Sequence, residues 1–349
     1  MDEINFNPTN PVYIKDLEKI AVVVPWQELM GKGIAVSGAT GLLGSLIIDF
    51  LLYLNKEYNA NIQVLALGRS LEKIKHRFSE VGNSNLFGVK RFELSGSFPE
   101  IEVDYIIHCA GNSHPKLFAE DPVGTLMGNI LGTETVLKYC RNHNAKALIL
   151  SSGEIYGENC NGDIPMDEDY TGKLNLSTAR SCYSEGKRAM EALTQSYISQ
   201  FGVNAVIARP CRIFGPTMKR EDNKASAQFI RNGLNCIDIV LKSSGEQIFS
   251  YIYSADAVSA LLTILIKGQS GEAYNVANTS CNVMLKDLAT LIANKTNVNV
   301  VYKLTGEPGG SKVQNALLDN TKICTLGWKG LYSIEEAINQ TINILNNSI

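Results

Sequence analysis

Residues 33–44 read Gly-Ile-Ala-Val-Ser-Gly-Ala-Thr-Gly-Leu-Leu-Gly, an apolar run that ends in glycines at 38, 41 and 44. An amphipathic segment follows, so the pattern predicts a buried strand, a tight turn and the start of a helix. Such glycines let the backbone approach a pyrophosphate closely, and the helix N-terminus offers it free N–H groups. An ordinary strand-to-helix turn can look the same, so this stretch alone does not establish a nucleotide site.

Apolar segments that suit strands alternate with amphipathic segments through the first half of the chain. The strand candidates are 33–37, 62–67, 90–94, 104–109, 146–151 and 203–209. This alternation implies a parallel sheet with helices on both faces. We therefore expect the α/β class, with a Rossmann-type doubly wound parallel sheet and a smaller α+β lobe.

The chain has 349 residues, which is long for one core and suits two lobes that share a cleft. We expect residues 1–30 to form an N-terminal extension with a short helix outside the sheet. Residues 31–215, with parts of 254–267 and returning strands and helices, are expected to form a dinucleotide-binding domain. Residues 216–349, including 268–285, are expected to form mostly the substrate-binding lobe.

Composition argues against several classes of protein. The net charge is −3 and no basic block stands out, so we expect neither nucleic acid nor an anionic membrane as a partner. The N-terminus lacks a signal-peptide pattern, and no apolar run is long enough to span a membrane. Eight cysteines without Cys-x-x-Cys spacing indicate reduced thiols in the cytoplasm. Four histidines without paired spacing indicate no metal site.

A second motif, Tyr183-Ser-Glu-Gly-Lys187, lies in the helix predicted over 181–201. Tyr183 and Lys187 are one helical turn apart, so both side chains point the same way. A third, Leu150-Ser-Ser-Gly-Glu-Ile-Tyr-Gly157, follows a predicted buried strand and brings Ser152 and Glu154. Each motif alone is compatible with an unremarkable helix face or strand end.

Together and in this order, the motifs resemble the extended short-chain dehydrogenase/reductase family, which includes the NAD-dependent epimerases and dehydratases. The resemblance covers roughly residues 30–345. Its further signatures are Asp104-Tyr-Ile-Ile-His-Cys-Ala-Gly111, residues 129–137, residues 272–278 and Leu326-Gly-Trp328.

The resemblance implies a nicotinamide dinucleotide as cofactor. The residues expected to contact it are Gly38, Thr40, Gly41, Leu42, Leu43, Gly44, Arg69, Ser70, Ala110, Gly111, Asn129, Tyr183, Lys187, Pro210 and Ile213.

The end of the second predicted strand distinguishes NADP from NAD. It reads Ala66-Leu-Gly-Arg-Ser70, without the carboxylate that binds the ribose 2′-OH of NAD, and Arg69 suits the 2′-phosphate of NADP. This favours NADP, with NAD as the alternative if Arg69 only stacks on adenine or faces solvent. Family members usually carry an aspartate after the third strand; here Phe92-Glu-Leu-Ser-Gly96 alters that contact.

The resemblance gives Ser152, Glu154, Tyr183 and Lys187 catalytic roles. Ser152 would hydrogen-bond the substrate oxygen, and Tyr183 would exchange a proton with it. A free phenol has a pKa near ~10, and we expect the Lys187 ammonium and a cationic nicotinamide to lower it. Lys187 would also bind the nicotinamide ribose while hydride passes between an alcohol and the cofactor.

Glu154 resembles the glutamate of UDP-glucuronate decarboxylases and nucleotide-sugar 4,6-dehydratases, where a carboxylate manages the proton at C5 after C4 becomes a ketone. In dehydratases with a Thr-Asp-Glu signature, the residue before the glutamate helps to protonate the departing hydroxyl. Here that residue is Gly153, which has no proton to give. Loss of CO2 needs no such acid, so Gly153 favours decarboxylation.

Residues expected to contact a nucleotide-linked sugar are Ser113, His114, Gly153, Arg180, Arg212, Lys224 and Phe249. Three of these depart from the decarboxylase pattern. Arg212 stands where an asparagine usually contacts the diphosphate, and Phe249 and Lys224 stand where arginines are usual. Ordinary exposed basic residues would explain Arg212 and Lys224 equally well.

Three functions therefore stand side by side. The first is a decarboxylase- or dehydratase-like enzyme with hydride transfer at C4 of a nucleotide-linked sugar, feeding cell-surface polysaccharide synthesis. The second is an NADPH-dependent reductase of a nucleotide-linked keto sugar or ketose, and the third is a non-catalytic dinucleotide-binding protein. We also expect a homodimer, formed by the helices near 120–140 and 181–201 through apolar residues such as Leu126, Ile130 and Leu193.

Overall fold

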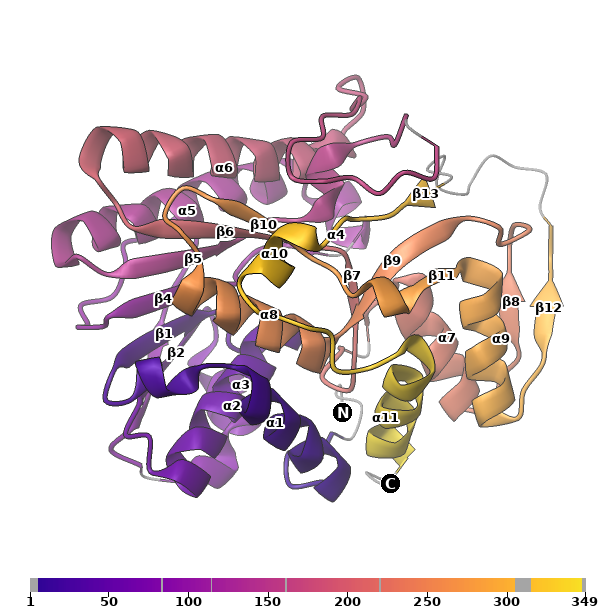
Figure 1. Ribbon diagram of the computed structural model, residues 1–349, viewed down its shortest axis with the longest axis horizontal. Coiled ribbons are helices and arrows are strands. Elements are labelled where there is room, and N and C mark those ends of the chain that lie inside the picture. Colours follow the sequence, from indigo (N-terminus) through magenta and orange to yellow (C-terminus); the bar gives the residue numbers. More distant parts are fainter. Residues whose placement is uncertain are drawn as a thin grey trace.

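The computed structural model describes residues 6–82, 84–113, 115–160, 162–219, 221–304 and 315–346. Its main sheet has seven parallel strands in the order β10-β6-β5-β4-β1-β2-β3 (Figure 1). The strand order reverses between β1 and β4, so the predicted doubly wound α/β class is confirmed. The strands are β1 (Gly33–Ser37), β2 (Gln63–Gly68), β3 (Phe87–Arg91), β4 (Tyr105–His108), β5 (Lys146–Leu150), β6 (Ala205–Pro210) and β10 (Ala273–Val276).

The central strands are apolar on both sides because helices cover both faces of the sheet. In β1, Ile34 and Val36 enter one hydrophobic core, whereas Ala35 enters the other. Helices α5 and α6 lie side by side on one face, and α1, α2 and α8 lie on the other (Figure 1). The helices of this layered body are α1 (Pro11–Val23), α2 (Leu42–Tyr58), α3 (Leu71–Arg77), α4 (Pro115–Glu120), α5 (Pro122–His143), α6 (Ser181–Phe201) and α8 (Ser254–Lys267).

A smaller lobe follows β6 in the chain. Strand β9 is its centre and pairs with β7, β11 and β13, while β8 and β12 pair separately. Its strands are β7 (Arg212–Phe214), β8 (Ile239–Leu241), β9 (Ile248–Tyr253), β11 (Asn282–Met284), β12 (Val300–Tyr302) and β13 (Asn315–Ala316). The remaining helices are α7 (Ala225–Leu234), α9 (Leu285–Thr296), α10 (Thr321–Thr325) and α11 (Ile334–Asn346).

Two sequence predictions need correction. The third strand was expected at 90–94 but is Phe87–Arg91, because Glu93 begins a turn that Gly96 closes with a 3.0 Å bond to its carbonyl. Residues 268–285 were expected in the smaller lobe, yet Ala273–Val276 is the outermost strand of the main sheet. Gly271, with a φ of +88°, returns the chain from α8 to the open edge of β6.

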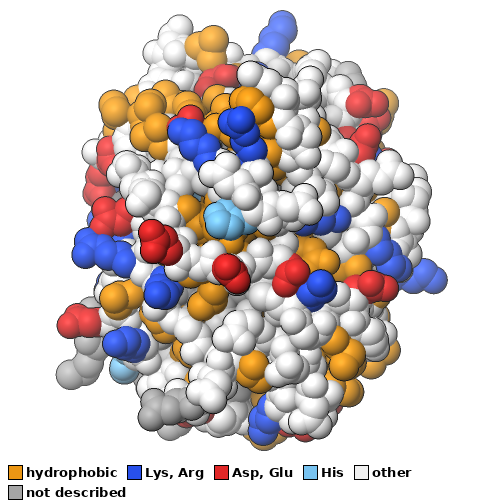
Figure 2. Space-filling view, turned by 90° about the vertical axis from the view of Figure 1, so that its left-hand side faces the viewer, with side chains coloured by type: hydrophobic (Ala, Val, Ile, Leu, Met, Phe, Trp, Pro, Cys, Tyr) orange, Lys and Arg blue, Asp and Glu red, His pale blue; other side chains and the backbone are white. Residues whose placement is uncertain are grey.

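The N-terminal helix α1 packs on α2, α8 and α11 rather than on the sheet itself. Tyr13 donates to Asp49 of α2 at 2.6 Å, and Asp16 accepts hydrogen bonds from Tyr253 of β9 and from Tyr332. Figure 2 shows one face of the molecule, on which acidic and basic side chains are interspersed and apolar ones gather in the upper left. Among the described residues, no helix combines the length and apolar character needed to cross a membrane.

Candidate active site

The expected site residues follow the carboxyl ends of the parallel strands. Since these ends share one edge of the sheet, the loops after β1, β2, β4, β5 and β6 meet there. Most of the site residues predicted from the sequence lie in these loops or just beyond them: Gly38, Thr40, Gly41, Arg69, Ser70, Ala110, Gly111, Ser113, Ser152, Gly153, Glu154, Arg212 and Ile213. Pro210 is the last residue of β6, and α5 and α6 contribute Asn129, Tyr183 and Lys187.

The glycine-rich turn between β1 and α2 is tight. Gly38 has a φ of +72°, and the Gly41 N–H donates to its carbonyl at 2.8 Å. A Cβ on Gly44 would lie 2.3 Å from that same carbonyl oxygen, so only glycine lets α2 begin this close to β1. Leu42 and Leu43 then form the first turn of α2, whose N–H groups face the edge of the sheet.

A second turn follows β4 and is tied to the first by a serine. Ser37, the last residue of β1, accepts a 3.2 Å bond from the Ala110 N–H and lies 2.8 Å from Nδ1 of His108. Burial, together with the charge of Lys187, lowers the pKa of His108 to about 3. The imidazole is therefore neutral, and the tautomer decides whether Nδ1 or the Ser37 hydroxyl donates in this contact. Sequence reasoning missed this pair, although two polar residues inside apolar strands were the available signal.

Asn129 on α5 is buried against the second turn. Its amide nitrogen donates to the Thr125 carbonyl at 2.9 Å, whereas its side-chain oxygen has no hydrogen-bond partner in the described part of the chain. A Cβ on Gly111 would lie 3.4 Å from this oxygen. An orphaned buried acceptor beside two glycine-bearing turns fits a dinucleotide, whose hydroxyl or amide groups can donate to it.

The end of β2 carries an exposed arginine, as expected from the sequence. Arg69 is exposed, and Ser70 caps α3 by accepting from the Lys73 N–H at 3.3 Å. The neighbouring Arg91 of β3 lies opposite Gly68 and is ion-paired with Glu93. Arg69 is thus available to an anion at this position.

Tyr183 and Lys187 lie on the buried side of α6, close to Ser152. The Lys187 ammonium donates to the Leu150 carbonyl at 2.6 Å, and its nitrogen is 6.0 Å from the centre of the Tyr183 ring. Ser152 caps the 3-10 turn η3 (Gly153–Tyr156) by accepting from the Glu154 N–H at 3.2 Å. The structure therefore brings together three of the four residues to which the sequence assigns catalysis, and Glu154 follows on the same turn.

The protein's own groups set the pKa of Tyr183 before any cofactor charge acts on it. Burial, aided by the charge of Glu154, raises it to about 12, while a hydrogen bond with Ser152 and the charge of Arg180 oppose the rise. Burial also lowers the pKa of Lys187 to about 8. The Lys187 ammonium donates its hydrogen bond to the Leu150 carbonyl and not to the Tyr183 phenol. Desolvation therefore dominates the pKa of Tyr183 in this site.

Glu154 is held by an arginine that the sequence assigned to substrate. Arg180 donates to its carboxylate at 2.7 Å, and both side chains are about half exposed. The guanidinium also lies 4.8 Å from the centre of the Phe118 ring, which stacks on Tyr183 at 4.4 Å. Phe118 of α4 was not predicted as a site residue. Its only signal in the sequence was its position in the segment that follows the Ala110-Gly111 turn.

The residues of the smaller lobe that are expected to contact substrate lie in different surroundings from one another. The Arg212 guanidinium lies 3.7 Å from the centre of the Phe249 ring, which is buried beneath it. Lys224 occupies the N-cap position of α7, and its ammonium is 3.7 Å from the Asp222 carboxylate. Gly153 packs on Leu318, and Ser113 is exposed. His114 lies outside the described residues.

The sequence matches the model of the NAD dependent epimerase/dehydratase family over residues 34–277. The chain belongs to this family. The match includes the glycine-rich turn, the Ser152 segment and the Tyr183–Lys187 motif, so the resemblance to extended short-chain dehydrogenases/reductases is confirmed, and the protein is an enzyme of this family.

Curated relatives from this family align along most of the chain. UDP-glucuronic acid decarboxylase 1 of Danio rerio is 26% identical over 91% of this chain and 73% of its own length. UDP-glucuronic acid decarboxylase 3 of Arabidopsis thaliana is 28% identical over 90% of this chain and 91% of its own length. Among solved structures, the NAD-bound dTDP-glucose 4,6-dehydratase of Streptomyces venezuelae superposes with a TM-score of 0.77 at 20% identity, covering 90% of this chain and 97% of that one.

Proposed function

We propose that the protein is an NAD(P)-dependent enzyme that oxidises C4 of a nucleotide-linked sugar acid and removes its carboxylate as CO2. The observation that carries this proposal is the placement of Glu154 two residues after Ser152, on the turn that faces Tyr183 and Lys187. A carboxylate beside the hydroxyl-binding pair suits chemistry at the carbon next to C4. The curated relatives that bear the name UDP-glucuronic acid decarboxylase support the same choice.

The residues of the chain can perform the proton steps of this reaction. A nicotinamide dinucleotide bound at the glycine-rich turn supplies the chemistry of accepting and returning a hydride at C4. Ser152 and Tyr183 hydrogen-bond the C4 oxygen, and Tyr183 takes its proton. Because burial holds the Tyr183 phenol protonated at neutral pH, it acts as a base only when positive charge comes close to it. Lys187, one turn away, orients the ribose.

Oxidation at C4 makes the sugar acid a β-keto acid. The bond between C5 and the carboxylate then breaks, CO2 leaves, and the electron pair passes to the C4 carbonyl as an enolate. Glu154 transfers to C5 the proton that this carbon takes up. Gly153 has no side chain to protonate a departing hydroxyl and packs against Leu318, which supports decarboxylation over dehydration.

The decisive experiment offers UDP-glucuronate and UDP-, CDP-, dTDP- and GDP-linked hexoses to the purified protein with NAD or NADP. Product masses and absorbance at 340 nm are followed together. A product lighter by CO2 with no net change at 340 nm is expected from the uronate. Absence of any product from every nucleotide sugar would exclude the proposal.

The second candidate, an NADPH-dependent reductase of a nucleotide-linked keto sugar, rests on the end of β2. Gly68 and Arg69 replace the carboxylate that reads the 2′-OH of NAD, and Arg69 is exposed. The same experiment separates the candidates, because a reductase consumes NADPH in step with product. We further propose NADP as the preferred cofactor, a homodimer as the assembly, the cytoplasm as the location and cell-surface polysaccharide synthesis as the process served.

A further inference from the structure

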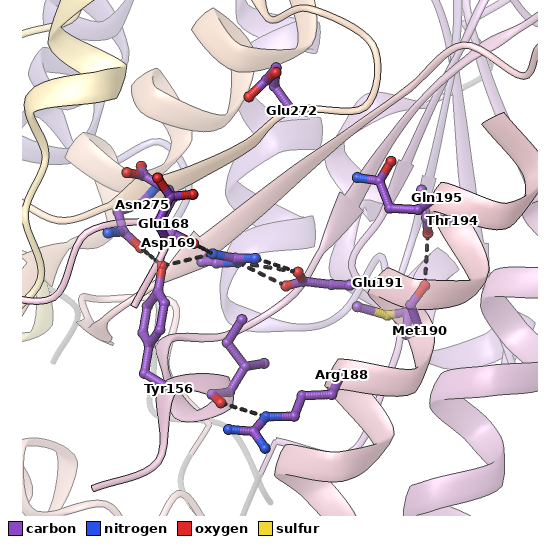
Figure 3. A network of polar contacts seen from close by, with 12 residues as sticks. Tyr156, Glu168, Asp169, Arg188, Met190, Glu191, Thr194, Gln195, Glu272 and Asn275 are labelled. Carbon is purple, nitrogen blue, oxygen red and sulfur yellow. Dashed lines mark hydrogen bonds and ion pairs between the residues drawn. The ribbon is translucent and has the colours of Figure 1, made fainter. Parts of the chain in front are cut away.

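The catalytic residues come from two segments that the chain does not hold together directly. Ser152 and Glu154 belong to the turn η3, whereas Tyr183 and Lys187 belong to α6, and residues 157–180 separate the two. Beneath them lies a buried polar network in which Tyr156, Glu191 and Asn275 converge (Figure 3).

Arg209 of β6 is the centre of this network. Its Nε and Nη2 donate to the Glu191 carboxylate, at 3.1 Å to Oε1 and 2.7 Å to Oε2. Its Nη1 donates to the Tyr156 hydroxyl at 3.0 Å and to the Glu168 carbonyl at 2.7 Å. The side chains of Arg209 and Glu191 are only 13% and 12% exposed. Burial opposes the charge of Arg209, but Glu191 outweighs burial and raises the pKa of the guanidinium.

The network extends from Tyr156 through Asn275 of β10 to the segments around Met166 and Asp319. The Tyr156 hydroxyl donates to the Asn275 side-chain oxygen at 2.6 Å, and the Asn275 amide donates to the carbonyls of Met166 and Asp319 at 3.0 and 2.9 Å. Asn275 and Tyr156 are almost completely buried. Every polar atom of these two side chains therefore has a partner, and the ring of Tyr156 has one position.

Both ends of the Arg209 contact lie next to catalytic residues. Glu191 is one helical turn after Lys187 on α6, and Tyr156 is the last residue of the turn that begins after Ser152. A second link runs in parallel, because Arg188 donates to the Ile155 carbonyl at 2.7 Å. Side chains of Arg188, Arg209 and Glu191 thus link η3 to α6.

We propose that Arg209 and Glu191 are positioning residues, which act through Tyr156 to hold Ser152 and Glu154 against Tyr183 and Lys187. A stability role alone explains the pair poorly, because buried ion pairs add little stability over apolar residues of the same volume. The planar guanidinium instead fixes the orientation of two elements, because its donors hydrogen-bond a carboxylate on one element and a hydroxyl on another. This inference rests on the proposed function, whose reaction supplies the measurement.

The test compares Arg209→Lys, Tyr156→Phe and the control Glu272→Gln by steady-state kinetics with the nucleotide sugar that the wild-type enzyme turns over. Arg209→Lys keeps the charge but loses the fork, and kcat is expected to fall by about 10²-fold at nearly constant KM, as for a small misplacement of reacting groups. Tyr156→Phe removes one hydrogen bond and is expected to lower kcat by up to about 10-fold. Glu272→Gln breaks a comparable but more exposed pair with Lys322, 2.6 Å long, and is expected to leave kcat unchanged.

A spectroscopic readout accompanies the kinetics. Displacement of Glu154 from Tyr183 uncouples the steps after C4 oxidation, so the variants are expected to release a 4-keto sugar and to show a rise at 340 nm that the wild type lacks. Folding is checked by cofactor binding, and Tyr156→Phe decides the matter if Arg209→Lys does not fold. A folded variant with unchanged kcat, or with a loss confined to KM, overturns the inference. A wild-type enzyme inert toward every nucleotide sugar overturns the proposed function instead.

Discussion

Arg180 and Glu154 form a 2.7 Å ion pair at the open side of the catalytic set. The pair keeps a carboxylate two residues from Ser152 and sets it beside the ring of Tyr183, whose pKa Glu154 raises and Arg180 lowers. The charge of Glu154 therefore acts on the Tyr183 phenol. The most informative predictions concern these groups.

Changing Glu154→Gln keeps the shape of the side chain and removes the carboxyl group that handles the C5 proton. If the enzyme works at C5 of a transient 4-ketone, the variant still oxidises C4 and then stalls. Absorbance at 340 nm and a bound 4-keto sugar, detected by mass, should rise together in a single turnover. Glu158→Gln, an exposed residue on the following segment, is the control. Steady consumption of NADPH by Glu154→Gln, with a nucleotide-linked alcohol as product, would support the reductase in its place.

Changing Tyr183→Phe should abolish turnover and spare cofactor binding. The ring keeps its stacking on Phe118 at 4.4 Å, whereas the proton relay is lost. One acid–base group contributes ~10²–10⁴-fold in rate, which initial-rate measurements resolve easily. More than a tenth of wild-type activity in this variant would show that another group carries the proton.

Changing Arg69→Ala should weaken NADP(H) more than NAD(H). The exposed guanidinium follows a strand end without a carboxylate, and a charge-assisted phosphate contact contributes roughly 1.5–3 kcal/mol. Fluorescence titration of both cofactors measures the difference without any turnover. Lys73→Ala on α3 controls for general loss of positive charge. An equal loss for the two cofactors means that Arg69 does not contact the 2′-phosphate.

The homodimer prediction has a surface to test. Leu126 and Leu193, which the sequence placed in the interface, are partly buried and pack against the protein's own cores. Val123 and Met127 of α5 are 71% and 41% exposed and lie four residues apart, on one side of the helix. Sedimentation at micromolar concentration should give a dimer for the wild type and a monomer for Met127→Glu. The same change at Val22 of α1, which is 84% exposed, should leave the dimer intact. A monomeric wild type refutes the assembly.

Asp256 should make stability depend on pH. Its carboxyl is completely buried, and burial raises its pKa to about 7, while an unfolded aspartate titrates near ~4. Between these values the folded state binds the extra proton, so stability falls as pH rises from about 4 to 7 and is then constant. Asp256→Asn should flatten this slope in thermal melts, whereas the exposed Asp287→Asn should not. An unchanged slope in Asp256→Asn would assign it to other groups.

Period and motif sufficed for the central strands of the main sheet, because strands such as β1 are continuous apolar runs and the glycines at 38, 41 and 44 have one steric explanation. They failed at β3 and β10. The former is half exposed, and the latter joins the sheet through a pairing with β6 that lies about 66 residues away in sequence. Local pattern carries no information about such a partner.

The same limit applies to the site. Tyr183, Lys187 and Ser152 could be assigned from spacing, since each motif is short. The partners that tune them could not, because Phe118, Arg180 and Arg209 reach the site from separate elements. Among the protein's own groups, burial raises the pKa of Tyr183, because desolvation depends on the packed environment and not on the nearest charge along the helix. The lowering expected from the cationic nicotinamide stays a prediction.

Helix α1 has a mechanical consequence. Through Tyr13 it is bonded to α2 on the main sheet, and through Asp16 to Tyr253 and Tyr332 on the other side. A hinge between the seven-stranded sheet and β9 would have to tear buried carboxylate–phenol bonds at one of these ends. Ligand binding by this protein is therefore expected to involve movements of loops and side chains at the carboxyl ends of the parallel strands. The two sheets are expected to keep a fixed position relative to each other.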